Sequence, residues 1–267
     1  MADVIKNKAP MYGQNKYNEA AAEAAFNRKQ VYRFGTPPII LDYEHATAQL
    51  VDGTAGDRTI HAYADGLNMT FYPIVGQAID APVPATTGMN YAYDQVDNDG
   101  FQLVMSDSVA KGREGLDRFT VGNQAFSAEL EFSIGDVTGS DDTFFGFAKV
   151  DVHRAAIDDC DEMAGFNIIG GVVNTETVIN NAATVTTDTT LDDWGDGEVH
   201  SLKVLVSKAG AVTYEYDGAT PTVTVAYSFD AGEVVTPTLY VLQDSDLNDS
   251  CILRKLTITS SNGSMEA

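Results

Sequence analysis

Carboxyl groups that share one face of a strand are the first candidates for chemistry, because paired acids can act as acid and nucleophile on a glycosidic bond. Glu129 and Glu131 form such a pair in the segment Phe126–Ile134, where apolar and polar residues alternate. A retaining pair must hold its two carboxyls about 5 Å apart. No third carboxylate accompanies them on that face. We therefore expect Glu129 and Glu131 to be solvated residues of a half-buried strand, not a catalytic pair.

Acidic turns are the second candidates, because alternating carboxylate and amide oxygens can coordinate calcium. The segment DSDLND at 244–249 spaces such oxygens suitably, but it has neither the glycine of an EF-hand turn nor a closing glutamate. Residues 97–100, 158–162 and 192–196 are similar acidic runs. In a chain this acidic we expect these runs to be solvated turns. No cofactor is predicted, although one structural calcium ion would relieve carboxylate repulsion.

The single tryptophan, Trp194, is the candidate for a glycan contact, since an exposed indole ring can stack on a pyranose face. It lies in the acidic segment DDWGDGEVH at 192–200. The alternative is structural: the ring would cover an edge of the core and fix the loop before a strand. Tyr91 and Tyr93 form a weaker aromatic pair. On the sequence alone, both roles of Trp194 stay open.

Nucleophilic catalysis and nucleotide chemistry lack their signatures in this chain. There is no Gly-x-Ser-x-Gly motif, no P-loop and no dinucleotide fingerprint. Cys160 stands among acidic residues, which disfavours a nucleophilic thiolate. Cys160 and Cys251 show no metal-binding spacing, and we predict two reduced, buried thiols. We expect that the chain is not an enzyme.

Charge divides the chain near residue 35. Residues 1–35 hold six basic and three acidic side chains, a balance of +3, whereas the whole chain carries −23, which leaves −26 for residues 36–267. So acidic a body disfavours nucleic acids and anionic membranes as partners. No apolar run approaches the roughly 18 residues that span a bilayer, and Met1–Gln14 is too polar for a secretory signal. We therefore expect synthesis in the cytoplasm.

The basic N-terminal arm, residues 1–35, is predicted to dock on another subunit. Its alanine-rich segment 16–30 has acidic residues near its start and basic residues at its end, which predicts a short helix. A helix of this length is marginal alone, so we expect it to pack on a neighbour or, alternatively, on its own domain. The expected docking residues are aromatic anchors and basic contacts: Tyr17, Phe26, Arg28, Lys29, Tyr32, Arg33 and Phe34.

The body of the chain is patterned for β-strands. Phe126–Ile134 alternates cleanly, and residues 143–150 follow a Gly-Ser-Asp-Asp turn that predicts a hairpin with it. Residues 73–100 are interpreted as long loops. Short strands separated by Gly and Asp turns, without a helix pattern between them, predict a mainly β fold, an antiparallel β-sandwich or jelly-roll. Further strands are expected at 39–43, 67–72, 101–105, 200–206, 212–216, 223–229, 238–242 and 252–258.

Residues 126–259 resemble the concanavalin A-like and laminin G-like β-sandwich. Three segments carry the resemblance: WGDGEVHSLKV at 194–204, GAVTYEYDG at 210–218 and FDAG at 229–232. It implies a sandwich domain over residues 126–262, with residues 36–125 either completing the sandwich or forming a small subdomain. This fold hosts lectins, glycosidases, lyases and structural modules, so the resemblance informs architecture more than function.

The character of the whole chain resembles the capsid decoration, or cement, proteins of tailed bacteriophages. The shared features are the basic arm, the acidic β body, the few cysteines and the lack of a signal segment. The resemblance implies an outer-capsid subunit that is made in the host cytoplasm and binds the major capsid protein and neighbouring copies of itself as a homotrimer. Two alternatives remain: a carbohydrate-binding or receptor-binding fibre module, and a polysaccharide hydrolase or lyase.

Overall fold

Strands dominate the part of the chain that the computed structural model describes. The described residues are 39–42, 48–54, 58–63, 68–74, 82–95, 100–104, 118–150, 156–243 and 247–261. All of them lie within one unit, residues 38–267. The helix predicted at 16–30 and the docking residues of the arm lie outside the described residues.

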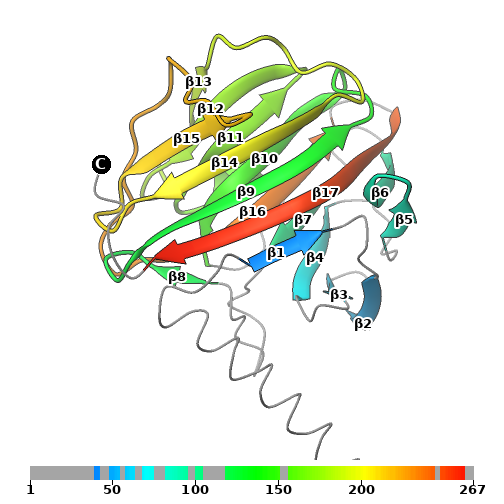
Figure 1. Cartoon of the computed structure of the whole chain (residues 1–267), viewed down its shortest axis with the longest axis horizontal. Coiled ribbons are helices and arrows are strands. Elements are labelled where there is room, and N and C mark those ends of the chain that lie inside the picture. Colours follow the sequence, from blue (N-terminus) through cyan, green and yellow to red (C-terminus); the bar gives the residue numbers. More distant parts are fainter. Residues whose placement is uncertain are drawn as a thin grey trace, which may run out of the picture. The chain divides into compact units, whose positions relative to one another are not determined.

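One sheet of the described region contains seven strands, all paired in antiparallel fashion (Figure 1). Its central strand, β17, pairs with β9 along one edge and with both β6 and β1 along the other. The order across the sheet is β15 (Val212–Tyr216), β14 (Val199–Val206), β9 (Ala125–Ile134), β17 (Leu247–Ser261), β6 (Gly88–Gln95) and β5 (Val83–Ala85), with β1 (Ile39–Asp42) beside β17.

The second sheet of the described region contains ten strands and is also antiparallel. Its order is β13 (Val185–Asp188), β12 (Val172–Val178), β11 (Met163–Ile169), β10 (Ser140–Lys149), β16 (Val234–Gln243), β7 (Gly100–Val104), β4 (Asn68–Ile74), β3 (Arg58–Tyr63) and β2 (Ala48–Thr54), with β8 (Phe119–Thr120) beside β16. Apart from the 3₁₀ turn η2 (Ile157–Asp159), these residues contain no helix. The predicted fold class, an antiparallel β-sandwich, is confirmed.

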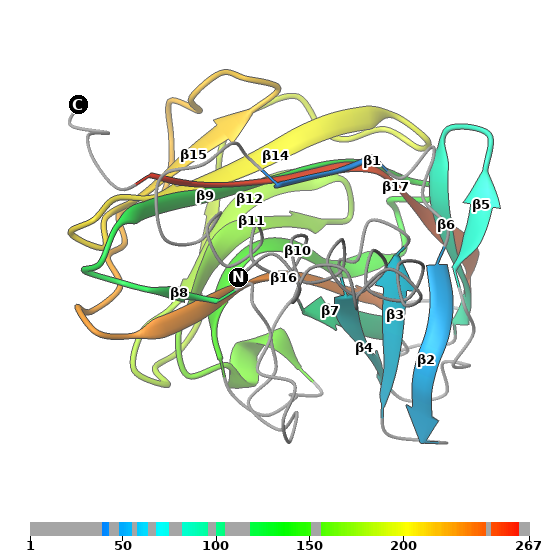
Figure 2. The ribbon, with the colours of Figure 1, turned by 60° about the horizontal axis from the view of Figure 1, so that its bottom comes forward.

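The core lies between the two sheets, which form separate layers in Figure 2. Alternate residues of β9 point into it, so that Phe126 and Phe132 are fully buried. From the other sheet, Phe147 meets Phe126 with a ring-centroid distance of 5.0 Å in an edge-to-face arrangement. The alternation predicted for 126–134 is therefore confirmed, and Glu129 and Glu131 of β9 lie on the opposite, half-buried face.

Three local predictions are wrong. The hairpin expected between 126–134 and 143–150 does not form, because β9 pairs with β14 and β17 whereas β10 pairs with β11 and β16 in the other sheet. Residues 73–100 are not only loops, since β5 and β6 form a hairpin there. Residues 223–229 form no strand; an isolated bridge joins Ala211 to Ser228 in this connecting segment.

The outer face of the ten-stranded sheet carries a second apolar cluster. Phe144 of β10 and Tyr240 of β16 are directly paired and fully buried there. Gly165 makes room for this packing, because a Cβ at that position would lie 2.6 Å from Cζ of Phe144. Ile157 and Cys160, in and after η2, belong to the same cluster, and Figure 2 shows η2 on that side of the sheet. This face is therefore partly covered, and polar groups on it lie in a low-dielectric setting.

Cys160 and Cys251 are both buried and are not joined by a disulfide, as predicted. Cys160 lies in the outer apolar cluster, whereas Cys251 of β17 lies in the core between the sheets. Their separate locations explain why no bridge forms.

Candidate functional site

Four neighbouring strands of the ten-stranded sheet bring a set of polar side chains together on its outer face. We name this set the carboxyl–amide cluster; its members are Asp142 of β10, Asn167 of β11, Glu176 of β12 and Thr186 of β13. The register places Glu176 directly opposite Thr186 and two pairs away from the pair that joins Asn167 to Asn174. The strands alternate, so the residues between these positions point into the core and the polar ones point away from it.

An amide nitrogen links the two carboxyl groups of the cluster. Asn167 Nδ2 donates one hydrogen bond to Asp142 Oδ1 at 2.5 Å and another to Glu176 Oε2 at 3.0 Å. The sum of these distances, 5.5 Å, is an upper limit for the separation of the two acceptor oxygens. The Thr186 hydroxyl donates a further bond of 2.9 Å to Glu176 Oε2. The side chain of Asn167 therefore lies between the carboxyls and holds both.

Burial shifts the protonation of these acids. Asn167 is fully buried and Glu176 is 2% exposed, while Asp142 is half-buried. Burial is the main cause that raises the pKa of Asp142 to about 7, and repulsion from Glu176, Asp141 and Asp158 adds to it, against the lowering effect of the Asn167 hydrogen bond. Burial likewise raises the pKa of Glu176. Near neutral pH the cluster therefore holds a proton that exposed carboxylates would have lost.

Two buried acceptor atoms of the cluster remain unused. Among the described residues, Asn167 Oδ1 and Glu176 Oε1 have no hydrogen-bond partner. Buried polar atoms in proteins are almost always paired, and an exception calls for an explanation such as a ligand or water. Thr186 is exposed and Asp142 is half-buried, so the cluster reaches the surface at β13 and β10. It can offer oxygen acceptors to a ligand that brings O–H or N–H donors.

This cluster is not among the sites predicted from the sequence. The sequence pattern places Asp142 in a turn and predicts no strand around Glu176. A signal was nevertheless present, because Asn174, Glu176 and Val178 occupy alternate positions of β12. An amide and a carboxyl side chain at alternate positions of a strand place two polar groups on the same face.

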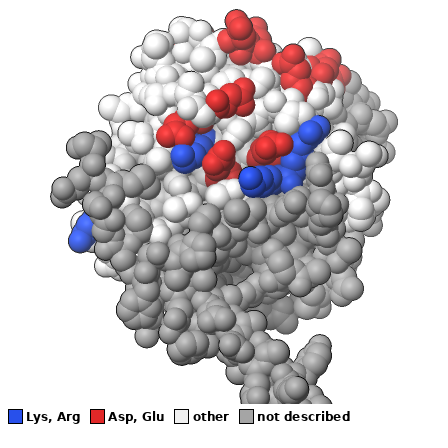
Figure 3. Space-filling model, viewed as in Figure 1, with Lys and Arg blue, Asp and Glu red and all other residues white. Residues whose placement is uncertain are grey.

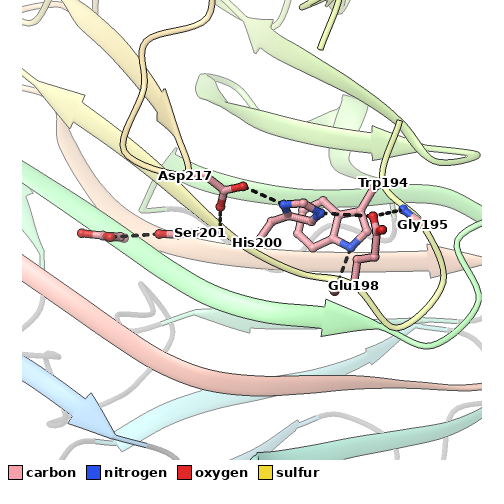
Figure 4. A network of polar contacts seen from close by, with 7 residues as sticks. Trp194, Gly195, Glu198, His200, Ser201 and Asp217 are labelled. Carbon is pink, nitrogen blue, oxygen red and sulfur yellow. Dashed lines mark hydrogen bonds and ion pairs between the residues drawn. The ribbon is translucent and has the colours of Figure 1, made fainter. Parts of the chain in front are cut away.

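Trp194 lies in the core at the loop before β14 (Figure 4). Its side chain is 1% exposed, and its ring lies 4.8 Å from that of Phe132. The indole Nε1 donates to the backbone carbonyl of Glu198 at 3.1 Å, and the backbone N–H of Trp194 donates to Gly171 O at 2.7 Å. Stacking on a sugar requires an exposed ring face, so this placement fits the structural role rather than the glycan contact.

A polar network fixes the same loop from outside (Figure 4). His200 Nδ1 lies 2.8 Å from Asp217 Oδ2, and its Nε2 lies 3.4 Å from Glu198 Oε2. The backbone N–H of Gly195 donates to Glu198 Oε2, and this bond, followed by the contact with His200, lowers the pKa of Glu198. Asp217 also accepts from the backbone N–H of Ser201. The network ties the loop to β14 and to the turn after β15.

Glu129 and Glu131 lie on the outer face of the seven-stranded sheet, whereas the carboxyl–amide cluster belongs to the ten-stranded sheet. Their direct cross-strand partners are Lys203 for Glu129 and Lys255 for Glu131. Figure 3 shows acidic and basic side chains interspersed over this face. Such pairing of opposite charges across strands is the pattern of a solvated surface, and it gives neither acid the environment of a catalytic group.

The acidic runs do not assemble a metal site in the described part of the chain. No group of three or more His, Cys, Asp or Glu side chains there could hold a metal ion. The runs at 97–100 and 244–249 fall wholly or partly outside the described residues. Within the same described part, no helix is long and apolar enough to cross a membrane.

The described part of the chain is an antiparallel β-sandwich of two sheets, with a polar cluster on the outer face of its ten-stranded sheet. No protein-family model matches the chain, and neither does any curated protein. A protein of unknown function from Shewanella oneidensis MR-1 is similar in structure, with 11% identity, 88% of this chain and 91% of that chain covered, and a TM-score of 0.52.

Two further solved structures have lower TM-scores. Lectin II from Ulex europaeus is 10% identical, with 85% of this chain and 100% of that chain covered and a TM-score of 0.49. The alginate lyase AlgAT5 of polysaccharide lyase family 7 is 12% identical, with 79% and 85% covered and a TM-score of 0.42. At these identities the likeness concerns the fold, and function must be argued from the site.

Proposed function

We propose that this β-sandwich is a non-catalytic carbohydrate-binding module and that the carboxyl–amide cluster binds its ligand. One observation carries the proposal: Asn167 Oδ1 and Glu176 Oε1 are buried acceptors without a partner among the described residues. Carbohydrates present dense O–H donors, and a site built to hydrogen-bond such groups discriminates strongly against ligands that lack them. The exposed Thr186 hydroxyl adds a group that both donates and accepts at the edge of the site.

The arrangement of the two acids supports binding over hydrolysis. In a glycosidase the acid pair flanks the scissile bond, which must lie between the carboxyls. Here the amide nitrogen of Asn167 occupies that space and bonds to Asp142 and Glu176 at the same time. This arrangement suits the binding of a ligand better than the placing of a scissile bond between the two acids.

Substitution within the cluster is expected to weaken glycan binding. A glycan array probed with the full chain at neutral pH should identify ligands. The affinity of each ligand can then be measured by calorimetry. Glu176→Gln keeps the shape of the side chain but removes its charge, and should weaken binding at least about tenfold, since hydrogen bonds to charged groups contribute about 1.5–3 kcal/mol. Glu129→Gln, on the other sheet, is the matched control and should leave affinity within about twofold.

Two results would contradict the proposal. One is a folded chain that binds no glycan on the array. The other is equal affinity for the Glu176→Gln variant and the unchanged chain, with the same thermal unfolding midpoint for both. The midpoint separates lost binding from lost folding.

A second candidate function is favoured by the charge asymmetry of the sequence. Residues 1–35 carry +3 and residues 36–267 carry −26. A basic arm on an acidic body suits an outer-capsid decoration subunit of a virion, made in the host cytoplasm, whose arm fastens it as a homotrimer to the major capsid protein and to neighbouring copies. Quantitative mass spectrometry of purified particles should then find it nearly stoichiometric with the shell protein. Its absence from particles would rule this function out, and a few copies would indicate a receptor-binding fibre.

A further inference from the structure

We propose that the group bound by the carboxyl–amide cluster is a primary ammonium, carried by an oligosaccharide of unacetylated amino sugars. This inference rests on the proposed carbohydrate-binding function and names the class of sugar. It follows from the charges around the cluster, from the two buried acceptor atoms without a partner, and from the proton that the cluster retains.

Among the described residues, the charges that act on Asp142 are all negative. Asp141, Asp158 and Glu176 all act on Asp142 in the sense that disfavours its charged form. Within the described part of the chain, neither Asp142 nor Glu176 contacts a lysine or an arginine. A like charge placed here would cost free energy, so sugars that carry carboxylates or sulfates do not fit. A cationic ligand would supply the missing opposite charge.

The hydrogen-bonding atoms of the cluster that lack a partner match an ammonium group. Asn167 Oδ1 and Glu176 Oε1 are acceptors only, and both are buried. An ammonium group offers three donors and no acceptor, so each of its N–H bonds can be used. A neutral hydroxyl offers one donor and would leave carboxylate charge buried without compensation. The acetamido group of an acetylated sugar offers a single N–H and is uncharged.

The retained proton is the third argument. Because the pKa of Asp142 is raised to about 7, the cluster keeps a proton close to neutral pH. That proton reduces repulsion among the carboxyls. An ammonium ligand can take its place and bring additional donors. A cation bound beside Glu176 and Asp142 would therefore compete with this proton.

Calorimetry with matched oligosaccharides tests this inference. The probes are a hexamer of glucosamine and a hexamer of N-acetylglucosamine, titrated into the full chain at pH 6.5 in 0.15 M NaCl. We expect the glucosamine hexamer to bind at least about tenfold more tightly, as one charge-assisted contact would provide. The double variant Asp142→Asn with Glu176→Gln should lose most of that preference.

A charge-matched control is necessary because a chain of net charge −23 attracts any polycation. The double variant Glu129→Gln with Glu131→Gln removes the same two charges from the outer face of the other sheet. It should keep the affinity within about twofold, because these side chains lie on the other sheet and two of 39 acidic residues contribute little to a screened attraction. Equal losses in both double variants would overturn the inference and indicate nonspecific attraction.

The remaining outcomes separate this inference from the proposed function. Equal binding of both hexamers, weakened by the Asp142 and Glu176 changes, would overturn the ammonium assignment and leave carbohydrate binding standing. No binding of either hexamer, together with a blank glycan array, would overturn both. A lysine hexamer that binds as tightly through the same two residues would assign the site to cationic peptides and overturn the amino-sugar assignment.

Discussion

Replacing Trp194 with alanine is expected to lower the free energy of unfolding by about 3–5 kcal/mol, the cost of removing a large buried aromatic side chain. The ring is 1% exposed and packs against Phe132 and His200. Its loss would leave a cavity at the edge of the core and remove the hydrogen bond from the indole Nε1 to the Glu198 carbonyl. The loop before β14 would lose the contact that fixes its position.

Urea unfolding monitored by circular dichroism measures this effect. Trp194→Phe should lose less than the alanine variant, because it keeps part of the ring packing. Asp193→Ala alters an exposed neighbour in the same loop and should change the stability by less than about 0.5 kcal/mol. If Trp194→Ala changed it equally little, the anchoring role of the tryptophan would be excluded.

Replacing Asp142 with asparagine is expected to change how stability depends on pH. The ordinary pKa of this carboxyl is 3.8 and its pKa in the fold is about 7. Between these values the folded state holds a proton that the unfolded chain has released. The binding of this proton therefore stabilises the folded state most below about pH 4, and its stabilising effect is lost as the pH rises to about 7. Full conversion of the shift gives an upper limit of roughly 4 kcal/mol, and solvent screening at a half-buried group reduces it to about 1–2 kcal/mol.

Denaturant titrations from pH 4 to pH 8 test this dependence. The Asp142→Asn variant cannot ionise, so it should match the unchanged chain near pH 4 and exceed its stability by about 1–2 kcal/mol at pH 8. A curve for Asp142→Asn that runs parallel to that of the unchanged chain would show that the pKa of this carboxyl is not raised in the fold.

Much of the strand content could be predicted because it is encoded locally. The alternation in Phe126–Ile134 gave β9 nearly to the residue, and the segments at 200–206 and 212–216 correspond to β14 and β15. The turn between those two strands contains Gly210, whose φ of 93° suits glycine. Local period and turn chemistry are sufficient for such hairpins.

Strand pairing and the site could not be predicted in the same way. Both β9 and β10 present apolar residues to the core, and that pattern does not say whether the two strands share a sheet or face each other across the core. Asp142, Asn167 and Glu176 become neighbours only because β11 lies between β10 and β12. Residues 223–229 have the composition of a strand, yet they form a connection that is fixed by contacts such as Val225 N–H to Thr175 Oγ1. These outcomes depend on tertiary partners, which local pattern does not contain.

The central place of β17 has a consequence for synthesis on the ribosome. Ile39 of β1 pairs with Ile258 of β17, and β9 pairs with the same strand. Until residue 261 has left the exit tunnel, β1, β6 and β9 each lack a neighbour, and their backbone edges are open to other strands. Before that point, the other strands of the seven-stranded sheet have been synthesised, but they cannot yet pair across the position of β17. We expect that the seven-stranded sheet closes only after β17 has left the tunnel and that chaperones which shield strand edges improve the yield of folded protein.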